Sequence, residues 1–290
     1  MLTKHGFGAL MTRKTVLFVP VLAEKFVAKA HERGADAVVL DLEDAVAPDS
    51  KIAARNALGE TIDLLVSREI EVWVRVNNTR ELLGGDLEAA VRAGVTGLMI
   101  PKVERVLELT TIASEVARLE TASALPKDNI VFCATLETPG GILAASSIAS
   151  GPRLQALALG GEDLAAALGI APRHAALRGP GQMVVLAAAA HGLESWGVMG
   201  SIANHTNMDR FAREVRLSRA LGVSTIICIH PKQVGVAAEI YRPDDDEAAW
   251  SADVVREYEA AKARGEGSIS LHGQMIDEPV YQRAMRMLGR

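Results

Sequence analysis

The sequence has little cysteine, few aromatic residues and no long apolar run. The two cysteines, Cys133 and Cys228, stand inside aliphatic segments of strand character, so we expect buried thiols rather than a disulfide or a metal-binding pair. Aromatic residues make up 4% of the chain and hydrophobic residues 49%, so the core must consist mainly of Ala, Val, Leu and Ile. No apolar stretch reaches the roughly 18 residues of a membrane-spanning helix, and residues 1–15 lack the apolar core of a signal peptide. We therefore expect a cytoplasmic protein with no membrane partner.

The chain has neither a basic stripe nor an acidic tail, and its one short acidic run is the turn DDDE at 244–247. Lys and Arg number 31 and Asp and Glu 36, which gives a net charge of −5 without a basic stripe or an acidic tail. Nucleic-acid-binding proteins usually carry such a basic stripe, so nucleic acid is not expected as a partner. The segment LALGGED does not form the G-x-G-x-x-G turn of dinucleotide-binding sites, and no nicotinamide cofactor is predicted.

Segments of strand character recur about every thirty residues and alternate with segments of helical spacing. The expected strands are 15–20, 37–43, 71–77, 97–102, 129–137, 154–163, 197–202 and 225–230. Strand and helix alternating in this way are typical of an α/β fold, in particular the (β/α)8 TIM barrel, for which about 250 residues is usual. An open doubly wound sheet is the alternative. We expect a barrel catalytic domain over residues 1–243 and a C-terminal helical extension or lid over 244–290.

Four polar residues, Glu43, Arg75, Glu137 and Asp163, close four different expected strands. Side chains alternate along a strand, so in the segment VWVRVN the valines face the helices and Arg75 faces the barrel interior. Parallel strands of a barrel end at one rim, where active sites of this fold lie. The pattern therefore predicts one shared site at the carboxyl ends of the strands.

This set of side chains favours metal-assisted chemistry on an oxoacid. Carboxylates without a cluster of His or Cys favour a hard cation such as Mg²⁺, and an arginine beside it can bind a carboxylate or stabilise an enolate oxygen. Two structural alternatives stay open. Arg75 could form an internal ion pair with Asp41 or Glu43, and Glu137 and Asp163 could cap the helices that follow them.

Several segments together carry a family resemblance, over about residues 12–284. In chain order they are TVLFVP, LDLEDAV, VWVRVNN, GLMIPKVE, ATLETPGGI, LALGGEDL, CIHPKQV and GQMIDEPV. In this order and spacing the chain resembles the HpcH/HpaI aldolase/citrate lyase family, in particular its citrate lyase β-subunit-like branch. The resemblance implies a (β/α)8 barrel that cleaves a 3-hydroxyacyl-coenzyme A of the citryl, malyl or citramalyl type into an acyl-coenzyme A and a 2-oxoacid.

The resemblance also assigns roles to the residues of the expected site. Glu137 of LETP and Asp163 of GGEDL match the Mg²⁺ ligands of the family, and Arg75 of VRVN matches the arginine that binds the substrate carboxylate and the enolate. Glu43 and Asp44 match acidic residues that hold metal-bound water and neighbouring side chains. Mg²⁺ is therefore the expected cofactor.

Further residues are expected to contact the substrate or a second subunit. Pro139 of LETP, and Arg13 and Lys14 as partners for coenzyme A phosphates, are the remaining substrate-binding candidates. Asp277 matches an aspartate that a neighbouring subunit's lid supplies for acid/base chemistry, although it could also be a simple helix N-cap. A homo-oligomer, a trimer or hexamer, is expected.

The chain departs from the family pattern in the first strand-to-helix loop. This loop reads VPVLAEK, with Val21 and Ala23 where Gly and Pro are common in the family. Because the loop should approach coenzyme A, two other functions remain open. One is a metal-dependent class II aldolase that acts on a 2-oxoacid and an aldehyde without coenzyme A. The other is a non-catalytic subunit of a lyase complex or a protein that binds an oxoacid or acyl-coenzyme A.

Overall fold

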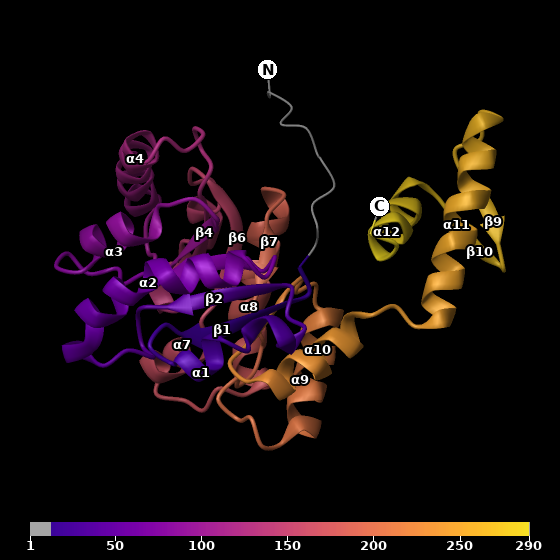
Figure 1. The fold of residues 1–290 in the computed structure, drawn as a ribbon. Helices are drawn as coiled ribbons and strands as arrows, with labels where there is room; N and C mark the ends of the chain where they lie inside the picture. The colour runs from indigo at the N-terminus through magenta and orange to yellow at the C-terminus, as the bar shows by residue number, and fades with distance from the viewer. Residues whose placement is uncertain (1–12, 290) are drawn as a thin grey trace. The chain divides into compact units, whose positions relative to one another are not determined.

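The computed structural model of the protein describes residues 13–289, which form two compact units (Figure 1). One unit comprises Arg13–Glu239, and the other begins at Ile240. None of the helices in the described part of the chain is both long and apolar enough to span a membrane.

Eight parallel strands form the sheet of the first unit in the order β7-β6-β5-β4-β3-β2-β1-β8. Their bounds are β1 Thr15–Pro20, β2 Ala37–Asp41, β3 Glu71–Arg75, β4 Val95–Ile100, β5 Val131–Leu136, β6 Leu154–Leu159, β7 Glu194–Trp196 and β8 Ile226–Cys228. The two end strands meet at a parallel bridge between Trp196 and Thr225, and the Gly197 amide donates to the Thr225 carbonyl at 2.9 Å. The predicted barrel is thus confirmed, and the open sheet is set aside.

Helices follow the strands and cover the outside of the barrel (Figure 1). Their bounds are α1 Glu24–Val27, α2 Lys51–Val66, α3 Leu83–Ala90, α4 Val106–Ala122, α5 Pro139–Leu143, α6 Ala145–Ile148, α7 Gly161–Leu168, α8 His174–Ala190, α9 Met208–Ala220 and α10 Pro231–Tyr241, with 3-10 turns at Ala30–Arg33 and Pro48–Ser50. In α2 the buried residues Ala54, Leu58, Ile62 and Leu65 recur every three or four positions, so one stripe of the helix packs on the sheet.

The barrel interior follows the predicted alternation of side chains. Trp73 belongs to the interior cluster together with Val39, Met99 and Cys133, whereas Val72 and Val74 alternate with it on β3. Cys133 and Cys228 are both buried and free, as expected.

The seventh strand is the clearest error of the sequence prediction. It was expected at 197–202 but lies at Glu194–Trp196, because the polar segment ESW does not show an aliphatic pattern. Its polar groups are satisfied inside the barrel, and Gly197, with φ 127°, ends the strand in a conformation that only glycine adopts readily. The sixth strand also ends earlier than expected, at Leu159, so Asp163 lies in the first turn of α7.

An ion-pair network closes the amino end of the barrel. Arg13 is 7% exposed, and its guanidinium donates to Glu71 at 2.6 Å and to Glu194 at 2.8 Å. The indole nitrogens of Trp73 and Trp196 donate to the same two carboxylates, and the two rings meet edge to face at 4.9 Å. A buried arginine shared between two carboxylates thus ties β3 to β7 across the barrel.

The second unit has a small core of its own. It consists of α11 (Asp245–Ala263), the antiparallel pair β9 (Ile269–Leu271) and β10 (Gln274–Ile276), and α12 (Glu278–Met287). A capping box between Asp244 and Glu247 starts α11, which explains the acidic run at this point of the sequence. Val254, Tyr258 and Ile276 are among its buried residues.

Replacing Arg13 tests the network at the amino end. We expect Arg13→Met to lower the free energy of unfolding by about 3–5 kcal/mol, because it leaves Glu71 and Glu194 without their buried cation. Urea denaturation measures this loss. The double variant Arg13→Met/Glu194→Gln should recover part of it, and an unchanged midpoint for Arg13→Met would contradict the assignment.

Candidate active site

A cavity of about 210 Å³ lies at the carboxyl ends of the barrel strands. Its lining includes Arg75 from β3, Thr135 from β5 and Asp163 from α7. Glu137, which directly follows β5, also lines it. Three of the four residues expected at the strand ends thus line one cavity, whereas Glu43 is not part of its lining. Asp44, which follows β2, also lines the cavity.

Glu137 is the most strongly perturbed carboxyl group of the site. It follows β5 directly and is 3% exposed, and its Oε1 accepts a hydrogen bond from the Lys102 amide at 2.8 Å. Burial raises its pKa to about 8, and the negative charges of Asp163 and Glu43 add to this effect. Its side chain packs on Gly160, where any Cβ would collide with it. Glycine at this position therefore leaves space for the buried carboxylate.

Asp163 faces the same cavity from the first turn of α7. The residue at the N-cap position of this helix is Gly160, and no side chain caps the helix there. Neighbouring Glu162 also lines the cavity, but its Oε1 accepts hydrogen bonds from the Ser201 hydroxyl at 2.6 Å and from the Ala203 amide at 3.2 Å. Of the two adjacent carboxylates, Asp163 is the one whose negative charge acts on Glu137.

Arg75 is held by three carboxylates from β2 and the loop after it. Asp41 accepts two hydrogen bonds, at 2.8 Å from Nε and at 2.7 Å from Nη2. On the other side Nη1 lies 2.9 Å from Glu43 and 3.3 Å from Asp44. Burial would lower the pKa of Arg75, but its hydrogen bonds and the charges of these acids raise it. The internal ion pair named as an alternative is therefore present, and the same guanidinium also lines the cavity.

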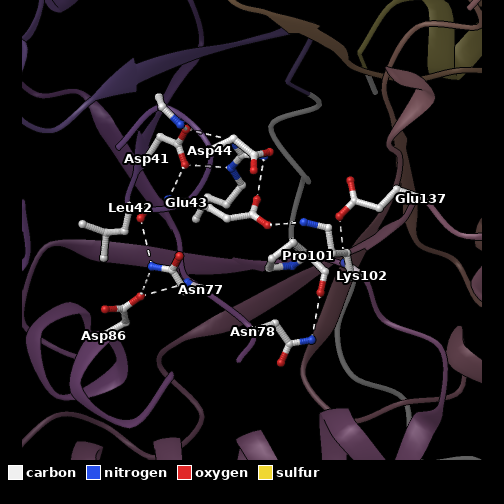
Figure 2. Close-up of polar contacts among 12 residues, drawn as sticks. Asp41, Leu42, Glu43, Asp44, Asn77, Asn78, Asp86, Pro101, Lys102 and Glu137 are labelled. Atoms are coloured by element: carbon white, nitrogen blue, oxygen red, sulfur yellow. Dashed lines mark hydrogen bonds and ion pairs between the residues drawn. The ribbon is translucent and has the colours of Figure 1, made fainter. Parts of the chain in front are cut away.

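Lys102 connects the two halves of the site (Figure 2). It follows β4 in a left-handed backbone conformation with φ 55°, which is uncommon for a residue with a side chain. Its amide donates to Glu137, and its Nζ donates to Glu43 Oε1 at 2.8 Å. Burial raises the pKa of Glu43, whereas the charges of Arg75 and Lys102 act in the opposite direction. Lys102 and Asp41 are the site residues that sequence reasoning did not select.

A hydrogen-bond network fixes the loop that carries Glu43. Asn77 Nδ2 donates to the Leu42 carbonyl at 2.9 Å and to Asp86 at 2.7 Å, and the Asn77 amide donates to the same carboxylate (Figure 2). Asp86 is buried and is also paired with Arg55 at 2.9 Å. The ends of β2 and β3 are therefore held at a fixed separation.

The structure corrects the expectation for Arg13 and Lys14. Both residues precede β1 and lie at the amino end of the barrel, where Arg13 is committed to Glu71 and Glu194. The cavity lies at the opposite ends of the strands, so these two basic residues are not placed to bind a substrate there. Strand polarity could have revealed this from the sequence, because a residue before a strand and a residue after it lie at opposite barrel ends.

The other two expected residues have different surroundings. Pro139 is exposed at the first turn of α5, two positions after Glu137. Asp277 is the N-cap of α12, where its carboxylate accepts from the Val280 amide at 3.3 Å. It thus fills the capping position that the sequence analysis gave as the alternative, and its part in catalysis stays a prediction.

The donor atoms at Glu137 and Asp163 suit Mg²⁺. This ion takes oxygen ligands and is commonly bound by one or two carboxylates together with water and substrate. Within residues 13–289 no group of three or more His, Cys, Asp or Glu forms a protein-only metal cage. Thr135 Oγ1, buried beneath Glu137, has no hydrogen-bond partner among the described residues. The cavity therefore combines a crowded carboxylate pair with a free hydroxyl, which fits a hydrated hard cation and an oxygen-rich ligand.

Fold and site together define a barrel enzyme with an acidic centre and a buried arginine, and comparisons with known proteins narrow this class. Residues 14–231 match the model of the family described as HpcH/HpaI aldolase/citrate lyase. The citrate lyase subunit beta of Escherichia coli strain K12 is 33% identical over 283 residues, which cover 96% of this chain and 93% of that protein. The chain belongs to the HpcH/HpaI aldolase/citrate lyase family and is an enzyme of the lyase class.

Two further relatives show the range of this family. The (3S)-malyl-CoA thioesterase of Cereibacter sphaeroides is 32% identical over 268 residues, which cover 91% of this chain and 89% of that protein. The protein CitE of Mycobacterium tuberculosis, solved with magnesium, acetoacetate and coenzyme A, aligns with a TM-score of 0.73 and 31% identity over 96% of this chain and 97% of that chain. These comparisons confirm the resemblance to citrate lyase β subunits drawn from the sequence.

The raised pKa of Glu137 predicts a pH-dependent stability. Between the ordinary value of 4.5 and about 8 the folded protein keeps a proton that the unfolded chain has lost. The unfolded state therefore binds fewer protons, and the free energy of unfolding falls as the pH rises through this window, by at most about 1.4 kcal/mol per pH unit. Urea denaturation in EDTA at a series of pH values should show a smaller fall for Glu137→Gln. If the free energy of unfolding depended on pH in the same way in the unsubstituted protein and in Glu137→Gln, the assignment would be contradicted.

The side chain of Lys102 can be tested apart from its amide. Lys102→Gly keeps the amide that holds Glu137, tolerates the positive φ and removes the whole side chain with its ammonium group. Because that side chain is 47% exposed, we expect the free energy of unfolding to change by less than about 1 kcal/mol. Lyase activity should fall roughly 10–100-fold, because Glu43 and Arg75 lose their support. Lys102→Arg is the matched control that keeps the charge, and full activity of the glycine variant would refute this role.

Proposed function

We propose that this protein is a Mg²⁺-dependent carbon–carbon lyase that cleaves a 3-hydroxyacyl-coenzyme A into an acyl-coenzyme A and a 2-oxoacid. The observation that carries the proposal is the Glu137–Asp163 carboxylate pair, which faces Arg75 across one cavity. The citrate lyase subunit beta of Escherichia coli supports the lyase class, and the malyl-CoA thioesterase and the structure solved with magnesium and coenzyme A support a coenzyme A thioester as ligand.

Glu137 and Asp163 would hold the metal, and Arg75 would bind the hydroxyacid end of the substrate. When bound, Mg²⁺ makes the substrate hydroxyl more acidic and stabilises negative charge on the carbonyl oxygen that forms. Asp41 fixes the guanidinium of Arg75 from behind through two hydrogen bonds, so that Nη1 is directed toward Asp44 and the cavity. An arginine held in this way needs little rearrangement when charge develops on the substrate.

The reaction is a retro-Claisen cleavage. A base removes the proton of the 3-hydroxyl, the C2–C3 bond breaks, and its electron pair forms the enolate of the thioester. The enolate is then protonated at C2, which gives the acyl-coenzyme A, and the former hydroxyl carbon becomes the carbonyl of the 2-oxoacid. Asp44 lines the cavity next to Arg75 with its side chain 56% exposed, and it is the carboxylate that we assign to this proton transfer. Glu43 is buried behind it and acts by positioning Arg75 and Lys102.

The coenzyme A end of the substrate extends from the cavity toward the rim. The helix α1 and the turn after it follow β1 at this rim, and they carry exposed Lys25 and Lys29. These two lysines replace Arg13 and Lys14 as proposed partners for phosphate groups. Asp277 would act only if the C-terminal unit of a neighbouring subunit covers the cavity, which requires a homo-oligomer.

Substitution of Glu137 tests the proposal. Glu137→Gln should weaken Mg²⁺ binding, measured by calorimetry, and lower thioester cleavage about 100-fold or more, because the metal loses an anionic ligand. Glu162→Gln is the matched control, since this neighbouring carboxylate is engaged by Ser201. Full Mg²⁺-dependent cleavage of citryl-, malyl- or citramalyl-coenzyme A by Glu137→Gln would refute the proposal.

A metal-dependent aldolase without coenzyme A is the second candidate. It is favoured by the altered first loop, where Val21 is buried, and by the location of Arg13 and Lys14 away from the site. The two functions are separated by assaying the same preparation for thioester cleavage and for condensation of a 2-oxoacid with an aldehyde. Condensation of the 2-oxoacid with the aldehyde, without cleavage of any thioester, would select the aldolase.

A further inference from the structure

The lining of the active-site cavity has an uneven distribution of charge. Arg75 is the one cation among the described lining residues. Four carboxylates share the lining with it: Asp44, Glu137, Glu162 and Asp163. The remaining side chains of the lining are almost all apolar: Phe18, Met99, Leu159, Val198, Ile202, Ala203, Ile227 and Ile229. The lining residues of β1 and β8 and of the segments that follow β7 and β8, among them Phe18, Ile202 and Ile227, are neighbours in the barrel and form one apolar side.

The apolar side is part of the barrel core. Ile227 is 6% exposed and belongs to the interior cluster, on which Phe18 and Ile202 pack. A carboxylate placed against these side chains would lose its hydration without gaining a partner, which is costly. Lys102 is not available to it, because its ammonium is bound to Glu43. This wall is therefore suited to an uncharged group.

The chemistry of the substrate decides which group reaches this wall. The carbon that becomes the oxo carbon carries a hydroxyl, a carboxylate, the CH₂-thioester arm and one further substituent. The hydroxyl and the carboxylate turn toward Arg75 and the Glu137–Asp163 pair. The thioester arm must point to the open mouth because coenzyme A is too large for a cavity of about 210 Å³. The remaining substituent then faces the apolar side.

We propose that the site selects a 2-oxoacid unit with a single carboxylate and a short uncharged substituent. This class includes glyoxylate and pyruvate, and it excludes dicarboxylic 2-oxoacids such as oxaloacetate as preferred ligands. The proposal rests on the lyase function proposed above and specifies the substrate class of the same site. A second carboxylate would meet either the apolar wall or further negative charge, and both are unfavourable.

Among the described residues of the lining, Thr135 is the one with an uncharged hydrogen-bonding side chain. Its hydroxyl is buried, the residue is 6% exposed, and Oγ1 has no hydrogen-bond partner among the described residues. Thr135 stands two positions before Glu137 on β5, so both side chains point to the same side of the strand. The hydroxyl is placed to donate a hydrogen bond to the single carboxylate of the oxoacid, which satisfies a group that would otherwise be buried at a cost.

Equilibrium binding tests the substrate class directly. Calorimetry with the full-length protein and Mg²⁺ would compare pyruvate, 2-oxobutyrate and freshly prepared oxaloacetate. We expect pyruvate and 2-oxobutyrate to bind at least about tenfold more tightly than oxaloacetate, because only the latter brings a second charge to the apolar wall. Equal or tighter binding of oxaloacetate would overturn the proposal.

Two pairs of variants connect this preference to the named residues. Ile202→Lys places a cation beside the apolar wall at a partly exposed position, and it should reduce the preference for pyruvate over oxaloacetate about tenfold, whereas Ile202→Met should not. Thr135→Val should weaken pyruvate binding about tenfold at an unchanged melting temperature, and Thr135→Ser should restore it. An unchanged preference in Ile202→Lys, or unchanged pyruvate binding in Thr135→Val, would contradict the assigned wall or the assigned donor.

Thioester cleavage separates this inference from the proposed function. Cleavage of malyl- or citramalyl-coenzyme A in preference to citryl-coenzyme A supports both. A preference for citryl-coenzyme A overturns the inference and leaves the lyase function intact. Selective binding of pyruvate without cleavage of any thioester overturns the lyase function and supports the inference as a property of the cavity.

Discussion

The active site depends on the two hydrogen bonds that Lys102 donates to residues from different strands. Its amide holds Glu137 at the end of β5, and its ammonium holds Glu43 after β2. Glu43 in turn pairs with Arg75 at 2.9 Å, so Lys102 links Glu137, which we propose as a metal ligand, to the arginine half of the site. The left-handed backbone of Lys102 is what allows both donors to point into the rim. A local conformational cost thus sets the geometry of groups that lie far apart in the sequence.

The electrostatics of the rim follow from this arrangement. Carboxylates outnumber cations around the cavity, and burial in the barrel mouth raises the pKa of Glu137 and of Glu43, so these two are harder to ionise. Arg75 and Lys102 compensate Asp41, Glu43 and Asp44, but neither forms an ion pair with Glu137 or Asp163. The uncompensated pair is the place where an added cation gains the most. Charge left without a partner is therefore the main reason for proposing the metal site at Glu137 and Asp163.

Much of the fold could be predicted from the sequence because its signals are local. The aliphatic strands and their alternation placed Trp73 and Arg75 in the barrel interior, and the length and repeat predicted the closed sheet. The seventh strand failed because its polar residues are satisfied only by tertiary partners such as Arg13. The strand ends brought Glu137 and Asp163 to one cavity, but the link through Lys102 depends on a positive φ that no sequence pattern announces. Arg13 and Lys14 were misplaced because their charge was considered without the direction of the strand that follows them.

The network of Arg13, Glu71 and Glu194 gives the barrel a structural end that is chemically separate from its reactive end. The residues that tie the strands together at the amino end take no part in the rim, and the cavity lining can change without disturbing them. The same barrel can therefore accept new side chains around Arg75 while the ion pairs at its amino end keep the strands together. Such a division makes diversification of substrates compatible with a constant scaffold, because the two demands fall on different residues.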